Sequence, residues 1–203
     1  MAVTVPPSAP PTVPTPRLPP EGDAYASWYG RVLGWAVTAG PPAQLVTGVG
    51  FDVLELPSDA GAAVLRRPVA TGPVALMGRR MRFLVAAGSA EELDGLLDWL
   101  EWGGVALDLT ALGAGGRITA PAPPGTSVRD SPRGAAVWLR PPEQGCEALL
   151  PALPGQGRAV GPRPGKGTAG PDLVRLVAAA ATECHRARLG RRTSAACQPL
   201  AFS

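Results

Sequence analysis

The stretch FDVLELPSDAG, residues 51–61, is the part of the sequence that decides the fold. It closes the longer run QLVTGVGFDVLELP, residues 44–57, whose second half is almost continuously apolar, as in a strand buried on both faces. Pro57 is expected to terminate the ladder, because proline has no backbone N–H to donate. Asp59 then predicts the cap of a helix over residues 60–67.

The chain before this strand begins with a tail rich in proline at residues 1–20, a composition that favours extended disorder over packing. Apolar residues at helical spacing follow and predict a first helix over residues 24–33, stopped by Gly34. The run WAVTA, residues 35–39, is short and apolar, which indicates a buried strand.

A hairpin and a helix are expected next along the chain. The runs at 73–77 and 80–86 are separated by two residues, so they predict two antiparallel strands joined by a tight turn. Ser89 and Glu92 have the spacing of a capping box and predict the start of a helix. The apolar stripe of that helix consists of Leu93, Leu96, Leu97 and Leu100.

Three further strands and a last helix complete the pattern. Residues 105–112 and a run from Arg117 are expected to pair across the turn GAGG, and a third strand covers residues 135–140. The final helix begins with Pro171 in its first turn, has Asp172 beside it, and ends in basic residues.

This order of elements predicts an α+β fold, with a mixed or antiparallel sheet flanked by helices, because helices and strands do not alternate regularly. The expected organisation is a disordered tail at 1–20, an α+β domain at 21–150, a Gly/Pro-rich linker at 151–170, a helix packing on the domain at 171–190 and a tail at 191–203.

Composition limits the class of protein. A chain of 203 residues suits one ordinary domain, and its 26 glycines and 25 prolines must lie mainly in tails and loops. The net charge of +3 permits contacts with nucleic acid or acidic surfaces without requiring them. Lys166 is the only lysine, so nearly all of the positive charge is arginine. Such a preference for arginine over lysine is typical of GC-rich coding sequences.

The sequence also indicates a compartment. Cys146, Cys184 and Cys197 have no paired spacing, which favours the reducing cytoplasm over an oxidising compartment. The N-terminus has neither a basic region nor an uninterrupted apolar core, and no run of about 18 apolar residues occurs. We therefore expect a cytoplasmic protein without a membrane partner.

Four segments carry a family resemblance, namely GWAV at 34–37, LVTGVGFDVLELP at 45–57, GPVALMGRRMRFLV at 72–85 and ALDLTALGAGGRITAPAPPG at 106–125. In this order they resemble the bifunctional DNA primase/polymerase N-terminal domain, the prim-pol family of the archaeo-eukaryotic primase superfamily. The resemblance covers residues 24–140 and implies a prim-pol-like fold. The last segment is the most specific, because its aspartate, paired glycines and APxP motif keep the family's spacing.

The resemblance implies a polymerase site in which carboxylates hold two divalent ions. In the family, a D-x-D pair ends the first strand, a later strand supplies a third acid, and a histidine on the hairpin contacts phosphates. The pair falls on Glu55 and Pro57, the third acid on Asp108, and the histidine on Arg80 or a neighbour. Glu55 and Asp108 would bind Mg²⁺ or Mn²⁺ in an active enzyme, whereas Pro57 offers no side-chain oxygen. Asp52 lies on the opposite strand face from Glu55 and is a poor replacement.

The expected function follows from that missing ligand. We expect a prim-pol-like domain that has lost catalysis, needs no cofactor, and acts as a regulatory module binding a nucleotide, nucleic acid or protein. Its expected phosphate-binding residues are Arg79, Arg80 and Arg82, unless they pair with the carboxylates or form a solvated hairpin edge. The alternative is an active DNA primase/polymerase nucleotidyltransferase that uses Glu55 and Asp108 with a divalent metal. A third reading is a purely structural interaction protein.

Two aromatic residues and the single histidine carry weaker signals. Trp99 and Trp102 are three residues apart, and they either stack on bases or pack a helix against the sheet. His185 is expected at the surface of a helix end, because no second metal ligand lies near it in the sequence.

Overall fold

The structure, a computed structural model, describes residues 21–38, 40–126, 135–154 and 172–196. The predicted tail at 1–20, most of the predicted linker at 151–170 and residues 197–203 lie outside the described residues. In the described ranges, no helix has the length and apolar character needed to cross a membrane.

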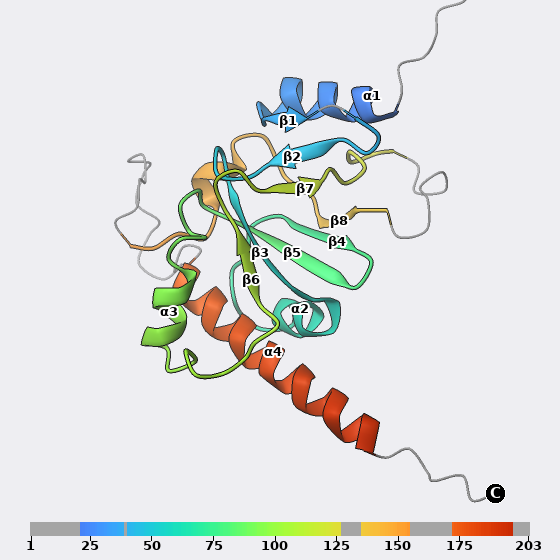
Figure 1. The fold of residues 1–203 in the computed structure, drawn as a ribbon. Helices are drawn as coiled ribbons and strands as arrows, with labels where there is room; N and C mark the ends of the chain where they lie inside the picture. The colour runs from blue at the N-terminus through green and yellow to red at the C-terminus, as the bar shows by residue number, and fades with distance from the viewer. Residues whose placement is uncertain (1–20, 39, 127–134, 155–171, 197–203) are drawn as a thin grey trace, which may run out of the picture.

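A five-stranded sheet lies at the centre of the fold (Figure 1). Its strands are β3 (Asp52–Pro57), β4 (Val74–Met77), β5 (Arg80–Val85), β6 (Thr110–Leu112) and β8 (Val137–Arg140). They lie in the order β6-β3-β5-β4-β8, and each neighbouring pair is antiparallel. The predicted hairpin is confirmed, because β4 and β5 pair directly across the two-residue turn.

A second sheet of three strands contains β1 (Val37–Thr38), β2 (Gln44–Val46) and β7 (Arg117–Thr119). These strands lie in the order β1-β2-β7 and are also antiparallel. The prediction of an α+β fold with antiparallel sheets is therefore confirmed at this level.

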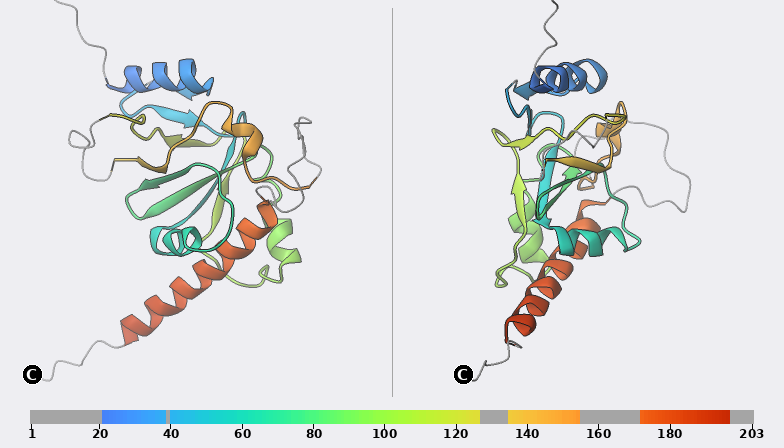
Figure 2. Two further views of the ribbon diagram at one scale, coloured as in Figure 1. Left: turned by 180° about the vertical axis from the view of Figure 1, so that it is seen from behind. Right: turned by 90° about the vertical axis from the view of Figure 1, so that its right-hand side faces the viewer.

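The helices form two groups at opposite ends of the molecule. They are α1 (Glu21–Trp28), the π-helical turn η1 (Tyr29–Leu33), α2 (Ser58–Leu65), α3 (Leu93–Trp99), the 3₁₀ turn η3 (Cys146–Leu149) and α4 (Leu173–Ala196). The end of η1 at Gly34, which has φ of 70°, agrees with the expected stop. Figures 1 and 2 show α1 with the small sheet at one end of the molecule and α2, α3 and α4 at the other.

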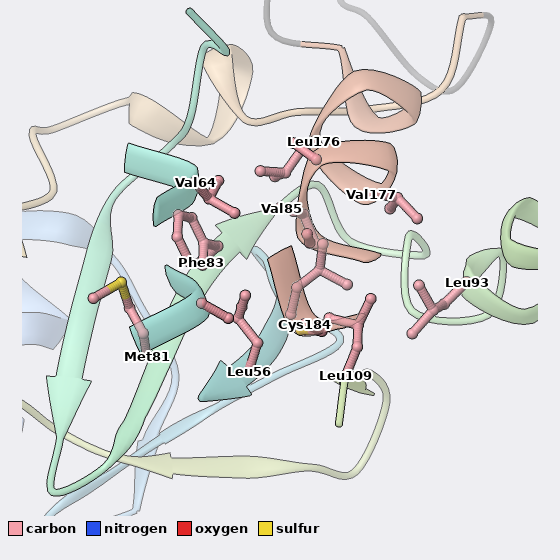
Figure 3. Packing of buried hydrophobic residues seen from close by; sticks show 14 of the residues in the cluster. Leu56, Val64, Met81, Phe83, Val85, Leu93, Leu109, Leu176, Val177 and Cys184 are labelled. Carbon is pink, nitrogen blue, oxygen red and sulfur yellow. The ribbon is translucent and has the colours of Figure 1, made fainter. Parts of the chain in front are cut away.

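Two hydrophobic clusters form on opposite faces of the central sheet, because side chains alternate along each strand. Met81 and Phe83 of β5 pack with α2 and α4 in the larger cluster, which Figure 3 shows from close by. Leu84, one residue along, packs in the second cluster with Leu45 of β2 and Ile118 of β7. The small sheet therefore covers one part of the face that the helices leave free.

The contact between α2 and β5 requires a glycine. A Cβ at Gly61 would lie 2.8 Å from Cβ of Met81, which is closer than real Cβ atoms approach one another. This close approach lets α2 pack directly on the sheet after Pro57, and the residue at the N-cap position is Pro57 rather than the predicted Asp59. Asp59 lies inside the first turn.

Several predicted strands are shorter than expected or differently paired. The predicted pairing across GAGG is wrong: β6 belongs to the central sheet and β7 to the small one. The run from residue 44 is split into β2 and β3, because residues 47–51 form a turn in which Gly48 N–H donates to the Phe51 carbonyl at 2.9 Å. The strand at 35–39 is reduced to β1, and its two residues are not buried.

The predicted helices also differ at their ends. The Ser89 side chain does not cap α3, since its hydroxyl oxygen is buried without a hydrogen-bond partner and the helix begins only at Leu93. The preceding residues form turns instead, with Glu92 N–H donating to the Ser89 carbonyl at 3.3 Å. At the other end of the chain, α4 continues to Ala196, beyond the predicted boundary at residue 190.

Candidate functional site

The predicted site residues lie on the face of the central sheet that α4 does not cover. Glu55 of β3 is directly opposite Arg82 of β5, and Pro57 is opposite Arg80. Strand alternation places Arg80 and Arg82 on the same face as Glu55, while Met81 between them packs in the helical cluster. Strand register therefore brings two arginines to one carboxylate.

Glu55 is held by both arginines at once. Its Oε1 accepts a hydrogen bond from Arg80 Nε at 3.0 Å, and its Oε2 accepts one from Arg82 Nε at 2.6 Å. The Glu55 carbonyl also accepts from Arg80 Nη2 at 3.3 Å. The side chains of Glu55 and Arg82 are only 17% and 14% exposed, so this ion pair is largely shielded from water.

Asp108 completes the cluster from the loop that precedes β6. Its Oδ1 accepts a hydrogen bond from Arg80 Nη1 at 2.6 Å, and its side chain is 51% exposed. The Asp108 carbonyl accepts from the Cys184 thiol of α4 at 3.6 Å. Glu55 and Asp108 therefore do come together, and the group that joins them is the Arg80 guanidinium.

The arginines determine the charge state of Glu55. Burial is the largest single influence and favours the neutral acid, but hydrogen bonds and charge from Arg82 and Arg80 outweigh it, so the pKa of Glu55 is lowered. For Arg80, burial acts against the charge, and Asp108 and Glu55 together raise its pKa. Two positive and two negative side chains thus form a charge-neutral network.

This donor set does not fit a pair of divalent ions. Both carboxylate oxygens of Glu55 and one of Asp108 are bonded to guanidinium groups, and Pro57 has no oxygen to offer. A cation placed between Glu55 and Asp108 would occupy the position of Arg80 and meet its charge. Among the residues that the structure describes, no group of three or more His, Cys, Asp or Glu side chains could hold a metal ion.

Arg79 lies apart from this network, at the turn of the β4–β5 hairpin. It is exposed, and its carbonyl accepts the Ser58 backbone N–H at 2.9 Å. The three arginines predicted as one phosphate-binding group are therefore two different features. Arg80 and Arg82 lie on the sheet face and are paired, while Arg79 is exposed at the hairpin turn.

The C-terminal half of α4 brings further arginines to this end of the sheet. Arg191 Nη1 lies 2.8 Å from Asp59 Oδ2, just after β3, and Arg188 donates to the Ala106 carbonyl two residues before Asp108. The arginines at this end of the sheet, which we call the basic edge, are Arg79, Arg186, Arg188 and Arg191. They outnumber the two nearby carboxylates, Asp59 and Glu183, and give this edge a positive charge.

Comparison with known proteins found no relative of this chain. No family model, curated protein or solved structure matches the chain. The chemistry of the site therefore has to be inferred from the contacts of its own residues.

Asp52 lies at the opposite end of β3 and has a structural position. It is 1% exposed, and its Oδ2 accepts the Ala90 backbone N–H at 2.8 Å. Its other oxygen is buried without a partner in the described residues, and burial raises the pKa of Asp52. As the sequence predicts, Asp52 is not directed toward Glu55 and cannot replace the missing ligand.

The two tryptophans differ in environment. Trp99 is 71% exposed at the end of α3, whereas Trp102 packs against His185 with the ring centroids 5.5 Å apart. His185 is half-buried in the middle of α4, and its Nδ1 atom is buried, so it does not lie at a helix end as the sequence predicts. Instead, the ring contact fixes the loop before β6 on α4.

Sequence reasoning missed the partners that α4 contributes. Arg191 contacts a residue 132 positions earlier, and Arg188 one 82 positions earlier. The only signal in the sequence is the basic end of the last helix, which does not indicate where that helix packs. Sequence reasoning also missed Met77, whose sulfur accepts from Arg82 Nη1 at 3.4 Å across the predicted hairpin.

Proposed function

We propose that this protein is a prim-pol-like module that has no polymerase activity and binds a phosphate-bearing ligand, a nucleotide or nucleic acid, at the basic edge. We propose the cytoplasm as its compartment, where its cysteines stay reduced. The observation that carries the proposal is the position of Arg80 between Glu55 and Asp108.

Loss of catalysis is supported by the state of the carboxylates. In-line nucleotidyl transfer needs free carboxylate oxygens to hold two cations against the reacting phosphate. Here both oxygens of Glu55 are bonded to arginine side chains, and Pro57 stands at the second position of the expected acidic pair. The alternative of an active nucleotidyltransferase requires Arg80 to leave both of its partners.

Phosphate binding is supported by the surplus of arginine at the same end. Guanidinium groups bind phosphate through paired N–H donors, and several of them on one surface attract an anionic chain from a distance. Arg79 is exposed at the hairpin turn, and the side chain of Arg186 is 64% exposed on α4. The two arginines belong to separate elements, the β4–β5 turn and α4, so we propose an extended ligand such as single-stranded nucleic acid.

We expect no primer extension when the protein is incubated with a primed template, nucleotides and Mg²⁺ or Mn²⁺. The carboxylate oxygens that would bind the metal are already hydrogen-bonded to arginine side chains. The measurement is product length on a denaturing gel, with an active polymerase as the positive control. Extension by the wild-type protein that Asp108→Ala abolishes would contradict the proposal and favour the active-enzyme alternative.

Arg79→Ala is expected to weaken binding of a fluorescein-labelled oligothymidylate about threefold at low salt, because one exposed phosphate contact is lost. Fluorescence anisotropy measures the affinity. The slope of the logarithm of the binding constant against the logarithm of the salt concentration should become smaller by about one. Arg117→Ala, which removes the same charge from β7 in the small sheet, is the matched control and should retain wild-type affinity. Equal loss in both variants would contradict a site at the basic edge, and no binding by the wild-type protein would contradict the proposed function.

A further inference from the structure

Arg80 is bonded to two carboxylates of different kinds. On one side, Nε and Nη2 donate to the side chain and backbone carbonyl of Glu55, whose side chain is 17% exposed. On the other side, Nη1 donates to Asp108, whose side chain is 51% exposed. The bond to Glu55 is therefore sheltered by the sheet, while the bond to Asp108 lies open to solvent and to any incoming anion.

The backbone that carries Asp108 is held independently of this ion pair. Its carbonyl accepts the Cys184 thiol, the Ala106 carbonyl accepts from Arg188, and Leu109 is buried in the helical cluster. Three anchors thus fix the loop on α4. The Asp108 side chain can rotate away from Arg80 without moving the loop, because χ rotation alone separates the two groups.

We propose that the Asp108 carboxylate is a built-in competitor for the ligand, occupying the outward-facing N–H group of Arg80 until a phosphate displaces it. This inference rests on the proposed function, since it adds Arg80, which lies beside the basic edge, to the proposed phosphate site and names how that site is regulated. Arg80 then remains held in place by Glu55 and presents Nη1 to the phosphate. The exposed Arg80–Asp108 ion pair lowers the affinity of Arg80 for phosphate and leaves the fold unchanged.

Asp108 can be exchanged for a phosphate because the Arg80–Asp108 ion pair is weaker than the Arg80–Glu55 ion pair. An ion pair as exposed as Arg80–Asp108 contributes little net stability, because water and salt screen it. A phosphate group carries more charge and more acceptor oxygens than one carboxylate, so it competes well for the same donor. The Glu55 contacts are less accessible and stay formed, which keeps the guanidinium preorganised.

Asp108→Asn is expected to tighten binding of the labelled oligothymidylate about threefold at low salt, and the gain should shrink as salt rises. Glu143→Gln removes one negative charge from an exposed position near the Trp35–Glu147 contact and should keep wild-type affinity. Asp108→Glu retains the carboxylate and should also bind as the wild-type protein does. Thermal melting of each variant, followed by circular dichroism, checks that the fold is unchanged.

Each outcome decides between the two proposals. Tighter binding by Asp108→Asn alone supports the inference. If the wild-type protein binds and Asp108→Asn matches Glu143→Gln, or if Asp108→Glu binds as tightly as Asp108→Asn, the competing carboxylate is refuted while the proposed function stands. If neither the wild-type protein nor Asp108→Asn binds, both proposals fail.

Discussion

Glu55→Ala is expected to lower the free energy of unfolding by about 3 kcal/mol at neutral pH, because it leaves a shielded pair of arginines without their acceptor. Arg80 Nε and Arg82 Nε both lose a bond, and their two positive charges then lie on one sheet face, where Asp108 pairs with Arg80. Urea denaturation monitored by circular dichroism measures the change. Asp108→Ala removes the exposed partner instead and should cost less than about 1 kcal/mol.

The pH dependence of the same variant tests the electrostatic cause. The pKa of Glu55 is lowered by folding from its ordinary value of 4.5, so the carboxylate stabilises the folded state above that value. This contribution is lost as the pH falls through the lower pKa of the folded state. The stability difference between the wild-type protein and Glu55→Ala should therefore shrink on acidification below 4.5. A difference that stays constant over this range would contradict an ionic origin.

Gly48→Ala is expected to destabilise the protein by about 3 kcal/mol, the sum of a left-handed backbone penalty and an overpacking penalty. Gly48 has φ of 85°, and a Cβ there would lie 2.6 Å from the Ala114 backbone N and 3.0 Å from the Ala114 Cβ. Because the obstacle is largely backbone, it cannot move aside as a flexible side chain does. The turn between β2 and β3 would separate from the turn between β6 and β7.

Gly78→Ala is the matched control for this prediction. Gly78 also has positive φ, at 57°, but a Cβ there would meet nothing within 4 Å. Gly78→Ala should therefore lower the free energy of unfolding only by the left-handed backbone penalty, about 1 kcal/mol. Urea midpoints of the two variants, measured at one pH, give the comparison. Equal losses would show that the contact with Ala114 contributes nothing.

The predicted hairpin was confirmed because its signals are local. Two apolar runs and a two-residue connection specify β4 and β5 without reference to the rest of the chain. The Leu stripe of α3 is confirmed for the same reason, since Leu93 and Leu96 are buried. The predicted capping box was wrong. A short polar side chain can form several local structures other than a helix cap, and Ser89 lies in a buried turn.

The candidate site was predictable only in part. Alternation along β5 already places Arg80 and Arg82 on one face and Met81 on the other, which separates them from Arg79 at the turn. Their pairing with Glu55 depends on the register of β3 against β5, which the structure shows and the sequence did not predict. The contact of Arg80 with Asp108 does not follow, because Asp108 precedes β6 in a loop whose path depends on α4.

The amino-acid sequence by itself determined the helical and strand segments with strong periodicity, the α+β class, and the absence of an oxygen donor at Pro57. These properties depend on residues close together in the chain, where backbone sterics and side-chain period act directly. Only the tertiary structure decided that β6 and β7 lie in different sheets and that Arg80 joins Glu55 to Asp108. Such contacts form between distant segments when hydrophobic packing brings them together, and no local pattern encodes which guanidinium will meet which carboxylate.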